Sequence, residues 1–234
     1  MSLSNALHDA LILLLSGDAA LWHIIWVSLK TTGIALLLAT PPAVVLGYGL
    51  ARGEFRGRRV LIWLAQATLA VPTVLIGLLL YLMLSRQGPL GGLHWLFAQP
   101  GIIAGQVLIA VPVLLAFTLA AVQAIDVRLA ETALSLGAGR WRVMLTVLRE
   151  ARFGVMAAVI TGFGRVISEV GCAMMVGGNI EGATRTMTTA IALETSKGQF
   201  AQGIALGIVL IVLALLINAG LMLAQGDDRL RGRV

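Results

Sequence analysis

An arginine and a glutamate inside an apolar stretch are the residues of this sequence with the clearest potential for chemistry. Arg165 and Glu169 are the only charged residues between positions 153 and 177. A charge at the centre of a membrane-spanning helix costs about 2.5–3.5 kcal/mol, and residues four apart share a helix face, so these two charges can neutralise each other. Two interpretations follow: a structural pair that holds helices together, or a pair that lines or gates a path.

A polar segment follows at residues 177–200. It is rich in glycine, threonine and asparagine and contains two cations, Arg185 and Lys197. Hydroxyls, backbone amides and scattered positive charge suit transient contact with a hydrated oxyanion. An ordinary solvated loop has the same composition, so this segment alone does not decide between the two.

Residues 126–152 predict two short amphipathic helices joined by a glycine turn. Leu129, Ala133 and Leu136 recur at helical spacing before the turn, and an i, i+3, i+4, i+7 pattern resumes after it. The turn contains Gly137 and Gly139, and the second pattern consists of Trp141, Met144, Leu145 and Leu148. These helices are too short to span a membrane, so their apolar faces must cover either the end of the bundle or another protein.

The elements that position these residues are predicted to be membrane-spanning helices. Of the 234 residues, 59% are hydrophobic and only 12% are charged, and the mean hydropathy is +0.94. This composition excludes the soluble globular and disordered classes and predicts an all-α, polytopic membrane protein. Five stretches are long enough to span: 31–51, which can begin near Leu21, then 60–84, 101–125, 153–177 and 201–225.

Charge along the chain predicts the orientation and the remaining segments. Twelve Lys and Arg residues fall on the side of the 126–152 loop and three on the other, which places the amino terminus outside and the carboxyl terminus in the cytoplasm. We expect an interfacial helix at residues 1–20, a transmembrane domain at 21–225 with the loop at 126–152, and a basic tail at 226–234. Prolines within the first three spans predict kinks at Pro41, Pro42, Pro72 and Pro112.

The 126–152 loop resembles the cytoplasmic loop of ABC importer permeases. Those proteins have E-A-A, three residues, G, nine residues, I, one residue and then L-P. This chain has Glu131-Thr132-Ala133, Gly137 and Val147 at those spacings, with Arg149-Glu150 in place of Leu-Pro. Residues 164–198 resemble the molybdate, sulfate and tungstate branch, most of all the tungstate permeases. The chain is therefore identified as similar to a type I ABC importer permease.

The resemblance implies partners and roles for particular residues. The loop is expected to act as a coupling helix that docks into a dimeric ATPase subunit, with Glu131, Thr132, Ala133, Gly137 and Trp141 involved. An extracytoplasmic binding protein is expected to deliver an oxyanion to a homodimer of this chain in the lipid of the inner membrane. Residues expected along the translocation pathway or at its gate are Arg165, Glu169, Asn179, Thr184, Arg185 and Thr188.

Other functional classes are less consistent with the sequence. It contains no G-x-x-x-x-G-K-[S/T] phosphate loop, and its three histidines lack metal-ligand spacing. We therefore expect a transport subunit that is not an enzyme, with no catalytic residues, metal or cofactor, and no nucleic-acid partner, because the positive charge reports topology. The alternatives are an ion-coupled secondary transporter, with Arg165 and Glu169 as its coupling site, and a membrane scaffold.

Overall fold

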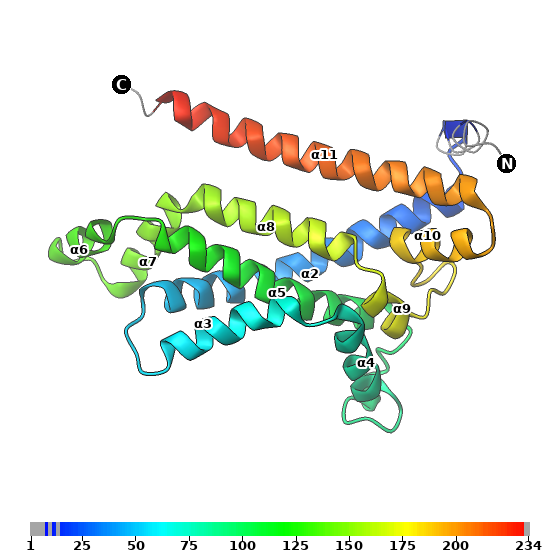
Figure 1. The fold of residues 1–234 in the computed structure, drawn as a ribbon, viewed down its shortest axis with the longest axis horizontal. Coiled ribbons are helices and arrows are strands. Elements are labelled where there is room, and N and C mark those ends of the chain that lie inside the picture. The colour runs from blue at the N-terminus through cyan, green and yellow to red at the C-terminus, as the bar shows by residue number, and fades with distance from the viewer. Residues whose placement is uncertain (1–7, 9–10, 13–14, 232–234) are drawn as a thin grey trace.

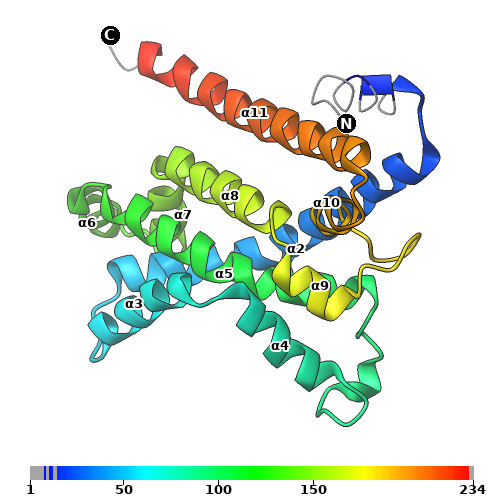
Figure 2. The same cartoon turned by 45° about the vertical axis from the view of Figure 1, so that its right-hand side comes forward.

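The chain forms an elongated helical bundle (Figures 1 and 2). The computed structural model describes residue 8, residues 11–12 and residues 15–231, and in this part of the chain every regular element is a helix. Most of the interfacial helix expected at residues 1–20 lies outside the described residues. The polytopic helical fold predicted from composition is confirmed.

Among the described residues, three helices are long and apolar enough to cross a membrane. They are α2 (Ala19–Arg52), α5 (Gln99–Gln123) and α11 (Phe200–Arg231), of which Phe200–Ile217 meets the criterion. The Asp18 carboxylate begins α2 by accepting a hydrogen bond of 2.8 Å from the amide of Leu21. α11 continues past the predicted fifth span into the segment expected as a basic tail.

Two bent pairs of helices are further candidate spans, so the described chain has three to five candidate spans. The first pair is α3 (Arg58–Ala67), extended by the 3₁₀ turn η1 (Thr68–Ala70), and α4 (Thr73–Leu84), which meet at 95°. The second pair is α8 (Arg152–Ile167) and α9 (Gly171–Gly177), which meet at 60°. The remaining short helices are η2 (Gly91–Leu93), α6 (Val127–Ser135), α7 (Arg140–Glu150) and α10 (Met187–Ser196).

Only one of the predicted proline kinks breaks its helix. Pro72 lies at the break before α4, whereas α2 continues through Pro41 and Pro42 and α5 through Pro112. α2 packs along α5 over much of its length, and Gly47 brings the two backbones so close that a Cβ there would lie 3.0 Å from Thr118. This packing offsets the hydrogen bonds that the interior prolines remove.

In the part of the chain that the structure describes, two apolar clusters hold the bundle. The larger joins α2, α5 and α8 and includes Ala39, Leu114 and Val166. The smaller joins the start of α2 to α10 and α11 and includes Leu21 and Met187. In both views α6 and α7 lie at the opposite end of the bundle from α10 (Figures 1 and 2).

The carboxyl end of α11 lies at the same end as α6 and α7 (Figure 1). This arrangement agrees with the relative placement of loop and carboxyl terminus predicted from the charges, while the direction of the bundle in a membrane stays a prediction.

Candidate functional site

The second halves of the two bent spans pack against each other. Glycines permit this approach: a Cβ added at Gly171 would lie 2.5 Å from Cγ2 of Val74, and one added at Gly77 would lie 2.7 Å from Cα of Cys172. Broken helices leave backbone groups that need other partners within the membrane. The junction between α4 and α9 therefore depends on side chains that form hydrogen bonds with the backbone groups left unpaired where each pair of helices breaks.

Glu169 supplies those contacts at the break between α8 and α9. Its Oε2 atom accepts a hydrogen bond of 3.0 Å from Nη1 of Arg165, and its Oε1 atom accepts one of 3.1 Å from the amide of Cys172, in the first turn of α9. The hydroxyl of Thr188 in α10 donates to the backbone carbonyl of Glu169 at 2.7 Å. The carboxylate, 3% exposed, thus connects the end of α8 to the start of α9.

Arg165 differs from its partner because its side chain is 44% exposed. It lines a small cavity of about 30 Å³ together with Thr68 and Thr73 at the other break and Pro112 of α5. The two residues of the pair therefore differ in their surroundings. Glu169 holds the break together, while Arg165 presents a cation to a cavity at the junction of both bent spans.

The other residues predicted for the gate lie in or beside the connection from α9 to α10. Asn179 has a left-handed backbone, with φ of 51°, and its amide donates to the carbonyl of Thr189 at 3.3 Å. The buried hydroxyl of Thr184 donates to the carbonyl of Gly177 at 2.5 Å and accepts from an amide four residues earlier. In this conformation these polar groups, like that of Thr188, hold the connection itself.

Arg185 is largely buried in the same connection. Its guanidinium pairs with the exposed carboxylate of Glu181 at 3.3 Å, and its side chain is only 12% exposed. The structure therefore brings Asn179, Thr184 and Arg185 together in one connection, and joins it to Glu169 through Thr188.

The residues predicted to couple to a partner protein lie on α6 and α7. Glu131 and Thr132 are exposed on α6 and Ala133 is half-buried. Gly137 has φ of +80°, a conformation that glycine adopts without the strain of a side chain. The predicted helix, glycine turn and helix are therefore all present.

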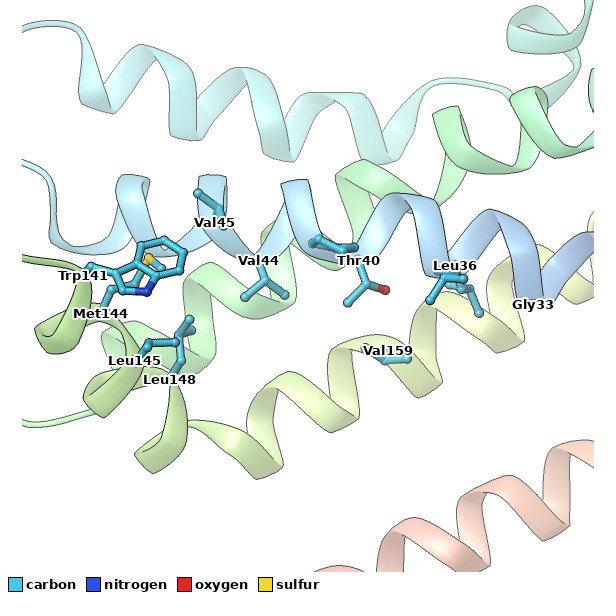
Figure 3. Close-up of a pocket in the computed structure, with 12 residues that line it drawn as sticks. Gly33, Leu36, Thr40, Val44, Val45, Trp141, Met144, Leu145, Leu148 and Val159 are labelled. Carbon is cyan, nitrogen blue, oxygen red and sulfur yellow. The ribbon is translucent and has the colours of Figure 1, made fainter.

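The packing of α7 differs from the stripe predicted from its sequence. Its buried residues are Val143, Met144 and Val147, whereas Trp141 is 64% exposed. Trp141 lines the end of an open apolar groove of about 580 Å³ between α2, α7 and α8, shared with Val44 and Val159 (Figure 3). The spans that neighbour α7 decide which side of this helix is covered. The periodicity of the sequence does not reveal where those spans lie.

Sequence reasoning missed several buried polar contacts. Gln106 of α5 is buried and donates to the hydroxyl of Thr32 at 3.3 Å. Glu194, also buried, pairs with Lys197 at 3.0 Å. Gln106 is uncharged, so a search for charged residues within apolar stretches does not find it. The three-residue spacing of Glu194 and Lys197 is the feature of the sequence that could have predicted their ion pair.

Comparisons with known proteins agree with this architecture. The chain is 38% identical over 210 residues to the tungstate uptake system permease protein TupB of Campylobacter jejuni, covering 90% of this chain and 88% of that protein. It is 37% identical over 214 residues to a probable anion ABC transporter permease protein of Haloferax volcanii, covering 89% and 90%. A solved structure of the MetNI methionine ABC transporter, in inward-facing conformations, matches with a TM-score of 0.66 at 14% identity, covering 92% of this chain and 94% of that one.

The family model described as binding-protein-dependent transport system inner membrane component matches residues 43–231. This range includes the α6–α7 loop and both bent spans. The chain belongs to this family and is a multi-pass inner-membrane permease subunit of an ABC importer, itself without catalytic activity.

Proposed function

We propose that two copies of this chain form the pathway of an importer for an oxyanion, tungstate first and molybdate or sulfate as related substrates. The observation that carries the proposal is the similarity over about nine-tenths of the chain to permeases named for tungstate and for anions. A separate dimeric ATPase drives transport, and an extracytoplasmic binding protein delivers the anion at the α10 end. The amino terminus is outside and the carboxyl terminus is cytoplasmic.

The α6–α7 loop is the proposed docking element for the ATPase. Its position at one end of the bundle (Figure 1) and its exposed polar residues Glu131 and Thr132 support this role. Two leucines beside the turn, Leu134 and Leu136, are 53% and 83% exposed. Exposed leucines next to a rigid turn suit insertion into a groove on a partner protein.

Arg165 is the proposed cation of the pathway. It lies where both bent spans break, and broken spans with small residues are the usual place for a substrate path through a membrane protein. Because Glu169 neutralises part of its charge at 3.0 Å, Arg165 would attract an oxyanion without retaining it. This balance is what a conduit requires.

The α9–α10 connection is the proposed gate and support for the binding protein. Asn179, Thr184, Arg185 and Thr188 form hydrogen bonds or an ion pair within the chain. Their role in the proposal is therefore to fix the shape of this connection, while exposed neighbours such as Glu181, 76% exposed, make the contact.

Uptake by the reconstituted system tests the proposal. Proteoliposomes with the permease, its ATPase and its binding protein are supplied with tungstate, molybdate and sulfate in competition, and the metal or sulfur taken up is measured. We expect tungstate uptake that requires an active ATPase and survives collapse of the ion gradients. Uptake that follows the ion gradients instead would indicate a secondary transporter, and no uptake of any of the three anions would indicate a scaffold.

A further inference from the structure

An arginine at the end of α2 is bonded to the junction between α5 and α6. Nη2 of Arg52 donates to the backbone carbonyl of Ile125 at 2.6 Å and to that of Val122 at 3.2 Å. The last carbonyls of a helix have no partner within the helix, and a cation there is favoured both by the helix dipole and by charge-assisted hydrogen bonding. Arg52 therefore fixes the end of α5 to the end of α2.

A second arginine holds the end of α2 in turn. Arg58, the first residue of α3, donates from Nε to the carbonyl of Leu50 at 2.6 Å and from Nη2 to that of Ala51 at 2.9 Å. Both arginines are partly buried, unlike the exposed Arg56 of the loop between these helices and the exposed Arg59 of α3. In the sequence all four arginines indicate only topology. In the structure Arg52 and Arg58 join the ends of three helices.

The junction that Arg52 holds leads directly into the proposed coupling loop. Ile125 is followed by Asp126, whose carboxylate accepts a hydrogen bond of 2.9 Å from the amide of Arg128 and so begins α6. No residue of α6 is buried, while α7 is anchored by three buried residues. α6 is therefore joined to the bundle in two ways: its partly buried residues Leu129, Ala130 and Ala133 pack against α7 and the main apolar cluster, and its start is continuous with the short segment that Arg52 fixes.

We propose that Arg52 is the positioning residue that transmits movement of the coupling loop to the membrane helices. With the carbonyls of Val122 and Ile125 bonded to Arg52, a displacement of α6 moves α5 and α2 together. Without these bonds, the backbone dihedrals between α5 and α6 absorb the displacement. The inference rests on the proposed function of the loop as the ATPase docking element.

Two replacements of Arg52 separate this role from its charge. Arg52→Met keeps the aliphatic stem but removes the cation and donors, and Arg52→Lys keeps the cation on a side chain that ends closer to the backbone and lacks the planar fork. Arg59→Met is the matched control, because Arg59 lies at the start of α3 close to Arg52 in the chain, is exposed and forms no side-chain hydrogen bond or ion pair with the described residues.

The measurement is the ratio of tungstate transported to ATP hydrolysed in proteoliposomes that contain the permease, ATPase and binding protein. Membrane abundance, thermal stability and copurification with the ATPase are recorded for each variant. We expect both Arg52 variants to pair normally with the ATPase and to hydrolyse ATP, while the ratio falls by about tenfold because both charge-assisted hydrogen bonds to the end of α5 are lost or weakened. Arg59→Met should keep the wild-type ratio.

Three results would overturn the proposal. A wild-type ratio in Arg52→Met would show that the contact transmits nothing. A wild-type ratio in Arg52→Lys with a loss in Arg52→Met would show that only the charge matters. A loss of abundance or of ATPase pairing that accounts for all lost transport would make Arg52 a folding contact. Failure of the proposed function is distinct, because the wild-type protein itself would then show no ATP-dependent uptake.

Discussion

The unequal burial of Arg165 and Glu169 predicts that losing the arginine is more costly than losing the acid. Arg165→Met leaves the carboxylate of Glu169, 3% exposed, with the amide of Cys172 as its remaining donor. Breaking a fully buried pair costs about 3–5 kcal/mol. Because the Arg165 side chain is 44% exposed, solvent screening lowers our expectation to about 3 kcal/mol.

Glu169→Gln is the milder change because an amide keeps an acceptor for the Cys172 amide and buries no charge. The guanidinium of Arg165 loses its ion pair but stays hydrated through its exposed portion, so we expect a cost of about 1 kcal/mol. The double variant buries no unpaired charge and should also cost about 1 kcal/mol, which gives an interaction energy of about 3 kcal/mol between the sites.

Thermal unfolding of the purified permease in detergent measures these differences. For a chain of this size, we expect the midpoint to fall by about 6–12 °C in Arg165→Met and by about 2–4 °C in Glu169→Gln and in the double variant. Additive losses, with the double variant the least stable, would refute the reasoning. Tungstate uptake gives the second readout: the double variant should regain stability but not transport, since it lacks the proposed pathway cation.

Two further predictions concern glycine positions and the coupling loop. Gly77→Ala should destabilise the protein by about 1–3 kcal/mol, because the new Cβ would lie 2.7 Å from Cα of Cys172. Gly49→Ala is the control: no atom lies within 4 Å of its new Cβ, so this variant should unfold at or slightly above the wild-type temperature. Equal unfolding midpoints for the two variants would contradict the close packing of α4 and α9. We expect Gly137→Val and Glu131→Lys each to leave membrane insertion intact and to abolish ATP-driven uptake. The first change strains the turn and the second alters the contact surface, and both lie at exposed positions of the loop. Normal uptake with wild-type ATPase copurification in both variants would remove the coupling assignment.

The sequence by itself determined the class of fold and the position of its main elements. Long apolar stretches predict helices because no other open structure satisfies its backbone in a membrane, and the structure has helices in all five stretches. The spacing of Gly137 and Gly139 between two amphipathic patterns likewise predicts α6, the turn and α7. These features depend on local periodicity and on single residues, so they can be read without knowing which helices are neighbours.

The tertiary structure decided which predicted charges and prolines have special roles. Pro72 breaks its span while Pro112 does not, because α5 is supported along its length by α2. Arg52 and Arg59 are indistinguishable as loop cations in the sequence, yet only Arg52 reaches the carbonyls at the end of α5, 70 and 73 residues away in the chain. The same limit applied to Trp141, since packing between distant segments determines which face of an amphipathic helix is buried.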